Sequence, residues 1–178
     1  VEAMSGKLLS LIDDVEYKVH KDRIYNEYLS GEIDFYGGEN CMTAYIIIDN
    51  KASWDYPIFL KKIHTGLEGG QREQAQGYGN ITGAKELYIA NTLVDTPAEI
   101  IEEMKFRLAK KMGCVTTEDT EFLKEWATWE KSMRFAHIPI HKRAHKIKVE
   151  PFTTFEQEKL YDRVKVCREW LNNFNESY

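Results

Sequence analysis

The stretch Thr43-Ala-Tyr-Ile-Ile-Ile-Asp-Asn-Lys51 decides which fold we expect for this chain. Its β-branched and apolar run over Thr43–Asp49 predicts a strand buried in the centre of a sheet. Alternation along a strand places Asp49 and Lys51 on one face and Asn50 on the other. A carboxylate at the end of a buried strand is costly unless it is paired or bound to a cation. We therefore expect this strand to end in a functional site.

The segments on both sides of this strand predict one mixed α/β domain. Helices are predicted over 1–19, 71–83, 96–112, 117–131 and 154–173, and strands over 23–29, 33–36, 86–91 and 145–150. Thr96 is the expected N-cap of its helix. Residues 52–70, which contain Pro57 and three glycines, are expected to form a mobile loop. This order indicates a mixed central β-sheet flanked by helices over 1–178, with a helical insertion near 96–131.

Two aspartates and a lysine fall on neighbouring predicted strands. Asp34 is expected on or just after the strand 33–36, fifteen positions before Asp49. Mg²⁺ prefers oxygen ligands and keeps several waters, so two carboxylates and a backbone carbonyl are enough to hold it. Such a metal would help a water molecule lose its proton, and Lys51 could orient that water. An ordinary Asp–Lys ion pair at a strand end is the alternative.

The helix after the loop adds two amides and a phenol on one face, from Gln71, Gln74 and Tyr78. In order, the chain reads Gly31-Glu-Ile-Asp34, then Ile46-Ile-Ile-Asp-Asn-Lys51, then Gln74-Ala-Gln-Gly-Tyr78. This order and spacing resemble the RecB-like branch of the PD-(D/E)-x-K nucleases, which includes lambda-type exonucleases. That branch shows G-x-(I/V)-D, a strand ending in D/E-x-K, and a helix with Q-x-x-x-Y.

The resemblance implies a restriction-endonuclease-like core and a role for each motif residue. It implies that Asp34 and Asp49 bind Mg²⁺ or Mn²⁺, that Asn50 adds its backbone carbonyl, that Lys51 is the catalytic lysine, and that Gln74 and Tyr78 position nucleic acid or the lysine. The chain departs from the branch in its first helix. Ser10 stands where the branch often has a histidine that completes the metal site, and Glu2, Glu16 or His20 are the candidate substitutes.

The net charge hides an uneven distribution. The 178 residues carry 24 Lys and Arg against 29 Asp and Glu, a formal charge of −5 that argues against a nucleic-acid partner. Residues 131–148 hold six of the basic residues and no acidic one, which leaves 18 basic against 29 acidic residues elsewhere, a charge of −11. This basic ribbon can neutralise phosphates through Lys142, Arg143 and Lys146. A solubilising surface strand is the alternative.

The tryptophans and histidines are further candidates for a binding role or for the core. Trp54, just beyond Lys51, is a candidate for stacking on a base, whereas Trp126, Trp129 and Trp170 are expected in the core. His137, His141 and His145 have a zinc-like spacing of four, but Pro139 argues against a helix there. The three cysteines form no C-x-x-C pair and no segment is long and apolar enough to span a bilayer, so a cytoplasmic location is expected.

These observations predict an enzyme, a divalent-metal-dependent deoxyribonuclease that hydrolyses phosphodiester bonds. The resemblance favours an exonuclease of DNA repair, recombination or phage DNA processing, with DNA as its partner. A recombination or helicase partner protein and an oligomer are compatible with the chain. The alternatives are an inactive nuclease-fold module that binds nucleic acid and a restriction-type endonuclease.

Overall fold

The computed structural model describes residues 1–114 and 116–176 as two compact units. Unit 1 consists of residues 1–17, 50–68 and 90–147, and unit 2 of residues 18–49, 69–89 and the chain from 148 onward. Several strands continue from one unit into the other, so the units are interleaved in sequence.

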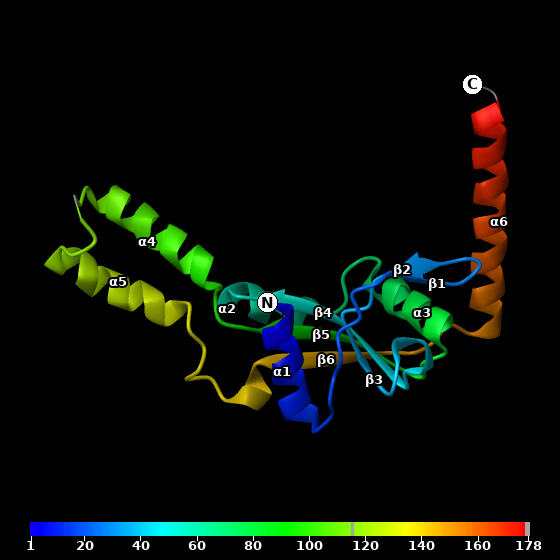
Figure 1. Cartoon of the computed structure of the whole chain (residues 1–178), viewed down its shortest axis with the longest axis horizontal. Coiled ribbons are helices and arrows are strands. Elements are labelled where there is room, and N and C mark those ends of the chain that lie inside the picture. Colours follow the sequence, from blue (N-terminus) through cyan, green and yellow to red (C-terminus); the bar gives the residue numbers. More distant parts are fainter. Residues whose placement is uncertain (115, 177–178) are drawn as a thin grey trace. The chain divides into compact units, whose positions relative to one another are not determined.

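A four-stranded sheet with the order β3-β4-β5-β6 is the centre of the fold (Figure 1). Its strands are β3 (Phe35–Gly37), β4 (Ile46–Ser53), β5 (Glu86–Leu93) and β6 (Ala144–Val149). β3 pairs antiparallel with β4, with Phe35 opposite Ile48. β1 (Ile24–Tyr25) and β2 (Ser30–Gly31) form a separate two-stranded sheet. The expected mixed α/β architecture, with a central sheet flanked by helices, is confirmed, although the strand predicted over 23–29 is only a two-residue segment.

β4 is buried as the sequence predicts, but it runs further than expected. Ile46, Ile47 and Ile48 are each at most 5% exposed. The expectation that the strand ends at Asp49–Lys51 is wrong, because β4 continues to Ser53, whose carbonyl accepts a hydrogen bond from Val94 N at 2.9 Å. Asp49, Asn50 and Lys51 therefore lie inside the strand.

The loop expected over 52–70 contains a helix, α2 (Tyr56–Thr65). Asp55 caps it by accepting a hydrogen bond from Ile58 N at 2.8 Å, and Pro57 lies in the first turn, where no backbone donor is needed. Phe59 is 1% exposed and packs with Leu93 and Phe135. The expectation of a mobile loop is wrong because the proline starts this helix and a buried aromatic side chain anchors it.

The other helices agree with the sequence in place and differ at their ends. They are α1 (Glu2–Asp13), α3 (Gln71–Thr82), α4 (Ala98–Met112), α5 (Thr120–Ser132) and α6 (Thr154–Glu176), with short 3-10 turns at Cys41–Thr43 and Ile140–Lys142. α1 ends early because Asp14 has a left-handed backbone with φ of 54°. Thr96 is not the N-cap of α4; Pro97 holds that position, and the Thr96 hydroxyl donates to the Trp54 carbonyl at 3.2 Å.

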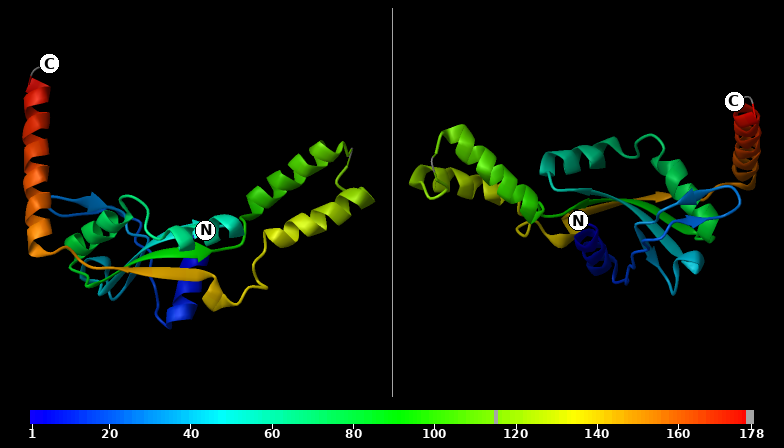
Figure 2. Two further views of the ribbon diagram at one scale, coloured as in Figure 1. Left: turned by 180° about the vertical axis from the view of Figure 1, so that it is seen from behind. Right: turned by 45° about the horizontal axis from the view of Figure 1, so that its top comes forward.

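α4 and α5 lie side by side within the stretch expected as a helical insertion (Figure 2). Phe122 and Trp126 are buried between them, and Trp129 packs at the edge of their core. The prediction for Trp170 is wrong, because this α6 side chain is 62% exposed and stacks on Phe174 rather than entering a core. No helix in the described ranges is long and apolar enough to cross a bilayer.

Candidate active site

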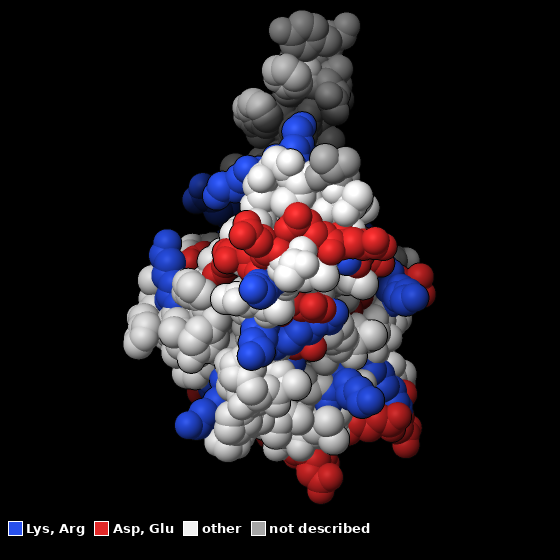
Figure 3. Space-filling model, turned by 90° about the vertical axis from the view of Figure 1, so that its left-hand side faces the viewer, with Lys and Arg blue, Asp and Glu red and all other residues white. Residues whose placement is uncertain are grey.

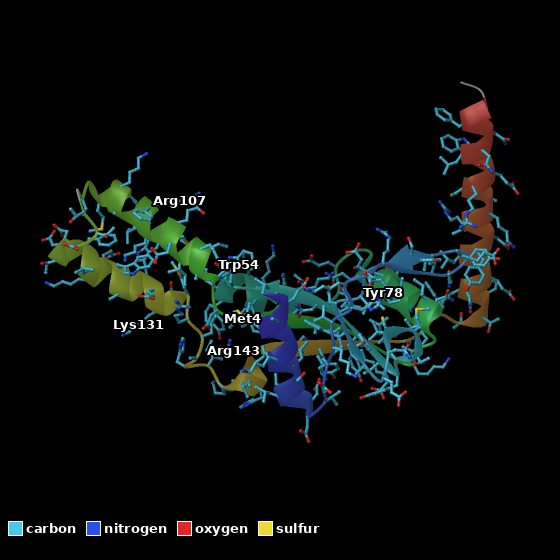
Figure 4. All side chains as sticks on the ribbon, in the orientation of Figure 1. Met4, Trp54, Tyr78, Arg107, Lys131 and Arg143 are labelled. Carbon is cyan, nitrogen blue, oxygen red and sulfur yellow. The ribbon has the colours of Figure 1, made fainter. Side chains whose placement is uncertain are left out.

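Unit 2 brings together motif residues that lie far apart in sequence. Asp49 is 2% exposed in β4. Asp34 is half-buried in the bend directly before β3, and not on or after that strand as expected. Both carboxylates lie close enough to act electrostatically on Tyr78. Figure 4 shows Tyr78 on α3. The two aspartates and the phenol therefore share one electrostatic environment.

The glutamine and the tyrosine of the Q-x-x-x-Y helix contact each other directly. Gln74 Nε2 donates a hydrogen bond to Tyr78 Oη at 2.8 Å, one turn further along α3. Burial raises the pKa of Tyr78, and the nearby carboxylates of Asp49, Asp34 and Glu32 raise it further, whereas the hydrogen bond from Gln74 lowers it. The phenol is thus protonated at neutral pH and can donate its O–H to an acceptor.

Gly31, the first residue of the G-x-I-D motif, packs against the same ring. A Cβ atom at position 31 would lie 2.5 Å from Tyr78 Cε1, well inside van der Waals contact. A glycine is needed here because the backbone of β2 approaches the aromatic face. The first and last elements of the motif series are therefore in direct contact.

A pocket of about 360 Å³ lies beside this ring within unit 2. The β1–β2 hairpin forms one wall with Arg23, Ser30 and Glu32, and α3 forms the other with Gln74 and Tyr78. Arg23 Nε donates to Ser30 Oγ at 3.3 Å. A polar ligand that enters this pocket would contact the motif glutamine and tyrosine.

In unit 1, the Asn50 side chain belongs to a hydrogen-bond chain that extends to α1. Thr92 Oγ1 donates to Asn50 Oδ1 at 2.8 Å and is 3.0 Å from the hydroxyl of Ser5. Ser5 and Thr92 are fully buried. This network engages the Asn50 side chain, and the role of its backbone carbonyl as a metal ligand stays a prediction.

A second lysine lies near Lys51. Lys62 of α2 donates through Nζ to Ser53 Oγ at 3.0 Å and to the Ala52 carbonyl at 3.4 Å. Burial lowers the pKa of Lys62, the charge of Glu68 opposes this shift, and the charge of Lys51 adds to it. Sequence reasoning missed this cation because it placed residues 52–70 in a loop; the i, i+4 spacing of Phe59 and Ile63 was the available signal for a helix.

The upstream histidine position is used for folding. Ser10 Oγ accepts a hydrogen bond from Tyr17 N at 3.1 Å in the turn after α1. Of the candidate substitutes, Glu2 and Glu16 are exposed, and His20 makes an edge contact with Tyr36. Within residues 1–114 and 116–176, no cluster of three or more His, Cys, Asp or Glu side chains is placed to hold a metal.

The donors that are present still fit a hard divalent cation. Asp34 and Asp49 offer carboxylate oxygens from unit 2, and one of these carboxylates is buried. Mg²⁺ is commonly held by one or two carboxylates and completes its shell with water and substrate phosphate. Asp34 and Asp49 are therefore the residues that would hold the ion.

The basic ribbon is partly engaged inside unit 1. Arg143 is 3.7 Å from Asp95 and donates to the Leu93 carbonyl, and Lys146 pairs with Asp13. These side chains are 17% and 25% exposed, whereas Lys142 is exposed. At the end of unit 1 that carries α4 and α5, acidic and basic side chains are intermixed (Figure 3). Of the three expected phosphate contacts, Lys142 is the most accessible.

Comparison with known proteins concerns the fold. No model of a protein family and no curated protein matches this chain. A phage-related exonuclease from Haemophilus somnus superposes with a TM-score of 0.62 at 19% identity, over 99% of this chain and 69% of that one. An alkaline exonuclease from Laribacter hongkongensis gives a TM-score of 0.45 at 11% identity, over 97% and 70%. The chain therefore has the fold of the phage-related exonuclease, which confirms the nuclease-like core at the level of the fold.

Proposed function

We propose that this chain is a divalent-metal-dependent DNA nuclease that acts as an exonuclease. The observation that carries the proposal is the convergence of Gly31, Asp34, Asp49, Gln74 and Tyr78 within unit 2. These residues are spread over 48 positions of sequence, yet the other four all contact or electrostatically affect the Tyr78 side chain. The fold of a phage-related exonuclease supports a role in phage DNA processing, repair or recombination.

The proposed chemistry assigns one task to each group. When bound at Asp34 and Asp49, the metal supplies a Lewis acid that activates water and offsets charge on the scissile phosphate. Lys51 orients the attacking water and stabilises the developing charge. Tyr78, held by Gln74, donates its O–H to a phosphate oxygen, because a phenol with a raised pKa stays protonated. The Asn50 backbone carbonyl is the third protein ligand in this proposal.

The test is digestion of linear duplex DNA and closed circular DNA with Mg²⁺ or Mn²⁺. We expect linear DNA to be degraded from its ends, and the circle to resist until it is cut by another enzyme. Asp49→Asn and Lys51→Met should each lower the rate by at least about 100-fold. Lys61→Met, which changes an exposed lysine on α2, is the matched control and should digest DNA at the wild-type rate.

The outcomes separate the alternatives. Cleavage of the closed circle would indicate a restriction-type endonuclease and contradict an exonuclease. Absence of cleavage by the wild-type protein, or equal cleavage by Asp49→Asn, contradicts the proposal.

A catalytically inactive nucleic-acid-binding module is the second candidate. One observation favours this candidate: among the described residues, no third His, Cys, Asp or Glu side chain forms a metal-binding cluster with Asp34 and Asp49. Salt-sensitive DNA binding without metal-dependent turnover would select this candidate.

A further inference from the structure

Unit 1 contains a large apolar pocket that the proposed chemistry does not use. It has a volume of about 1400 Å³ and lies entirely within unit 1. Aromatic side chains line it from three segments: Trp54 and Tyr56 at the start of α2, Trp129 in α5, and Phe135 and His137 after α5. Trp54 and Tyr56 are 43% and 41% exposed, so their surfaces face solvent in part.

Hydrogen bonds to backbone groups connect the walls of the pocket. Thr96 joins two of them, because its hydroxyl donates to the Trp54 carbonyl at 3.2 Å and its N–H to the Met133 carbonyl at 3.0 Å. Phe135 N donates to Asp95 Oδ1 at 2.8 Å. The aromatic side chains are thus carried by fixed backbone, which is what a preformed binding site requires.

The lining of the pocket combines flat aromatic surfaces with one lysine. Lys131, at the end of α5, lines the pocket (Figure 4), and His137 adds a second nitrogen donor. The acidic side chain in the lining, Asp55, is engaged as the cap of α2. Aromatic rings next to a cation are the combination by which proteins bind unpaired nucleobases and their phosphates.

Trp54 follows Lys51 by three residues of extended chain along β4 and its end, roughly 10 Å at 3.3 Å per residue. Both residues belong to unit 1. An unpaired DNA strand that contacts Lys51 is therefore within reach of Trp54.

We propose that this pocket binds unpaired nucleobases of the substrate. The inference rests on the proposed nuclease function and deepens it, because it makes a frayed or single-stranded DNA end the species that the enzyme holds. Trp54 and Trp129 stack on the bases, and Lys131 contacts a phosphate.

The test compares two single-stranded probes in EDTA, so that no cleavage occurs. One is a short oligothymidylate, and the other has the same length and the same phosphates but no bases. Trp54→Ala and Trp129→Ala should weaken binding of oligothymidylate by about 5- to 150-fold each and leave binding of the abasic probe unchanged. Trp129→Phe should keep most of the affinity, since it retains an aromatic face.

Trp170→Ala is the matched control, because Trp170 is exposed on α6 in unit 2. It should bind both probes as the wild type does. Equal binding of the two probes by the wild-type protein, or an equal loss for both in Trp54→Ala, overturns the inference and leaves the pocket to a protein partner. If Trp129→Ala does not fold, Trp54→Ala decides the matter, since this partly exposed side chain can be removed without opening a core.

The two proposals can fail separately. Base-dependent binding without metal-dependent cleavage would reject the nuclease and keep the pocket. Metal-dependent cleavage without base-dependent binding would keep the nuclease and reject the base-binding role of the pocket.

Discussion

At the scale of single residues, Tyr78 is the point where the motif residues of unit 2 meet. It is 7% exposed, contacts Gly31 through its ring and receives a hydrogen bond from Gln74 through its oxygen. Its raised pKa follows from burial and from the carboxylates around it. The same environment that suits a phosphate donor therefore also makes ionisation of this tyrosine unfavourable.

The raised pKa of Tyr78 predicts a pH-dependent stability. Because the folded state holds the phenolic proton more tightly than the unfolded chain, this contribution is complete below pH 10 and is lost as pH rises through the folded pKa. In urea titrations, the wild type should lose stability relative to Tyr78→Phe above pH 10 but not at pH 8. Tyr25→Phe is the matched control, since Tyr25 is 74% exposed. A difference between wild type and Tyr78→Phe that is the same at both pH values would contradict the prediction.

Gly31→Ala tests whether the position of the ring matters for activity. The added Cβ would lie 2.5 Å from Tyr78 Cε1, so the ring must move. A shift of about 1 Å costs up to about 100-fold in rate, and overpacking costs about 1–3 kcal/mol of stability. Gly69→Ala is the control, because a Cβ there meets open space. DNA digestion and urea unfolding check both effects, and wild-type activity in Gly31→Ala would show that the ring position is unimportant.

At the scale of elements, local signals predicted most helices and strands, and tertiary contacts decided the rest. α3 lies where its helical periodicity places it, and β5 begins at Glu86 as predicted, although β5 is buried along most of its length and continues to Leu93. α2 was missed because Pro57 and the nearby glycines were taken as signs of a loop, although proline is well suited to a first helical turn. Thr96 has the side chain of an N-cap but uses its hydroxyl for the Trp54 carbonyl.

The residues of the candidate site, like the elements of the fold, could be predicted from the sequence only in part. The order of the motifs predicted Asp34, Asp49, Gln74 and Tyr78, and unit 2 brings these side chains together. Lys62 and the walls of the aromatic pocket could not be predicted, because they depend on where α2 and the segment after α5 pack in unit 1. Sequence spacing carries information about residues on one element and little about residues that meet across elements.

The cap of α2 provides a test of how this helix is held. Asp55 accepts a hydrogen bond from Ile58 N at 2.8 Å, so Asp55→Ala should lower the free energy of unfolding by about 0.5–2 kcal/mol. Asp55→Asn should retain most of the stability, because its amide oxygen can accept the same bond. Asp22→Ala, at an exposed position outside helices and strands, is the control for loss of charge. Thermal unfolding measures the three variants, and an Asp55→Ala protein as stable as Asp22→Ala would argue against the cap.

At the scale of the whole molecule, the chain has a net charge of −5, and its basic side chains do not all play the same part. Arg143 and Lys146 are largely shielded and paired with Asp95 and Asp13, so they stabilise unit 1. Lys142 is exposed and can contact phosphate without breaking such a pair. The ribbon is therefore a weaker phosphate track than its six positive charges suggest.

Salt dependence separates these two kinds of cation. Lys142→Ala should reduce the slope of log affinity against log salt concentration for DNA binding by about 0.9 and leave thermal stability unchanged. Lys146→Ala should instead lower stability, because it leaves the mostly buried Asp13 carboxylate without its lysine partner. Binding titrations at several salt concentrations and thermal unfolding measure both variants. A change of slope in Lys146→Ala with unchanged stability would reverse the assignment.

The contact between Gly31 and Tyr78 also has a consequence for descent. A ring at position 78 leaves no room for a side chain at position 31, so a larger residue can replace Gly31 only where the ring is lost or moves. A relative with a larger residue in place of Gly31 should carry a smaller one in place of Tyr78. Under the proposed function, such paired replacements would mark lineages that have lost the phenol and, with it, the proposed phosphate contact.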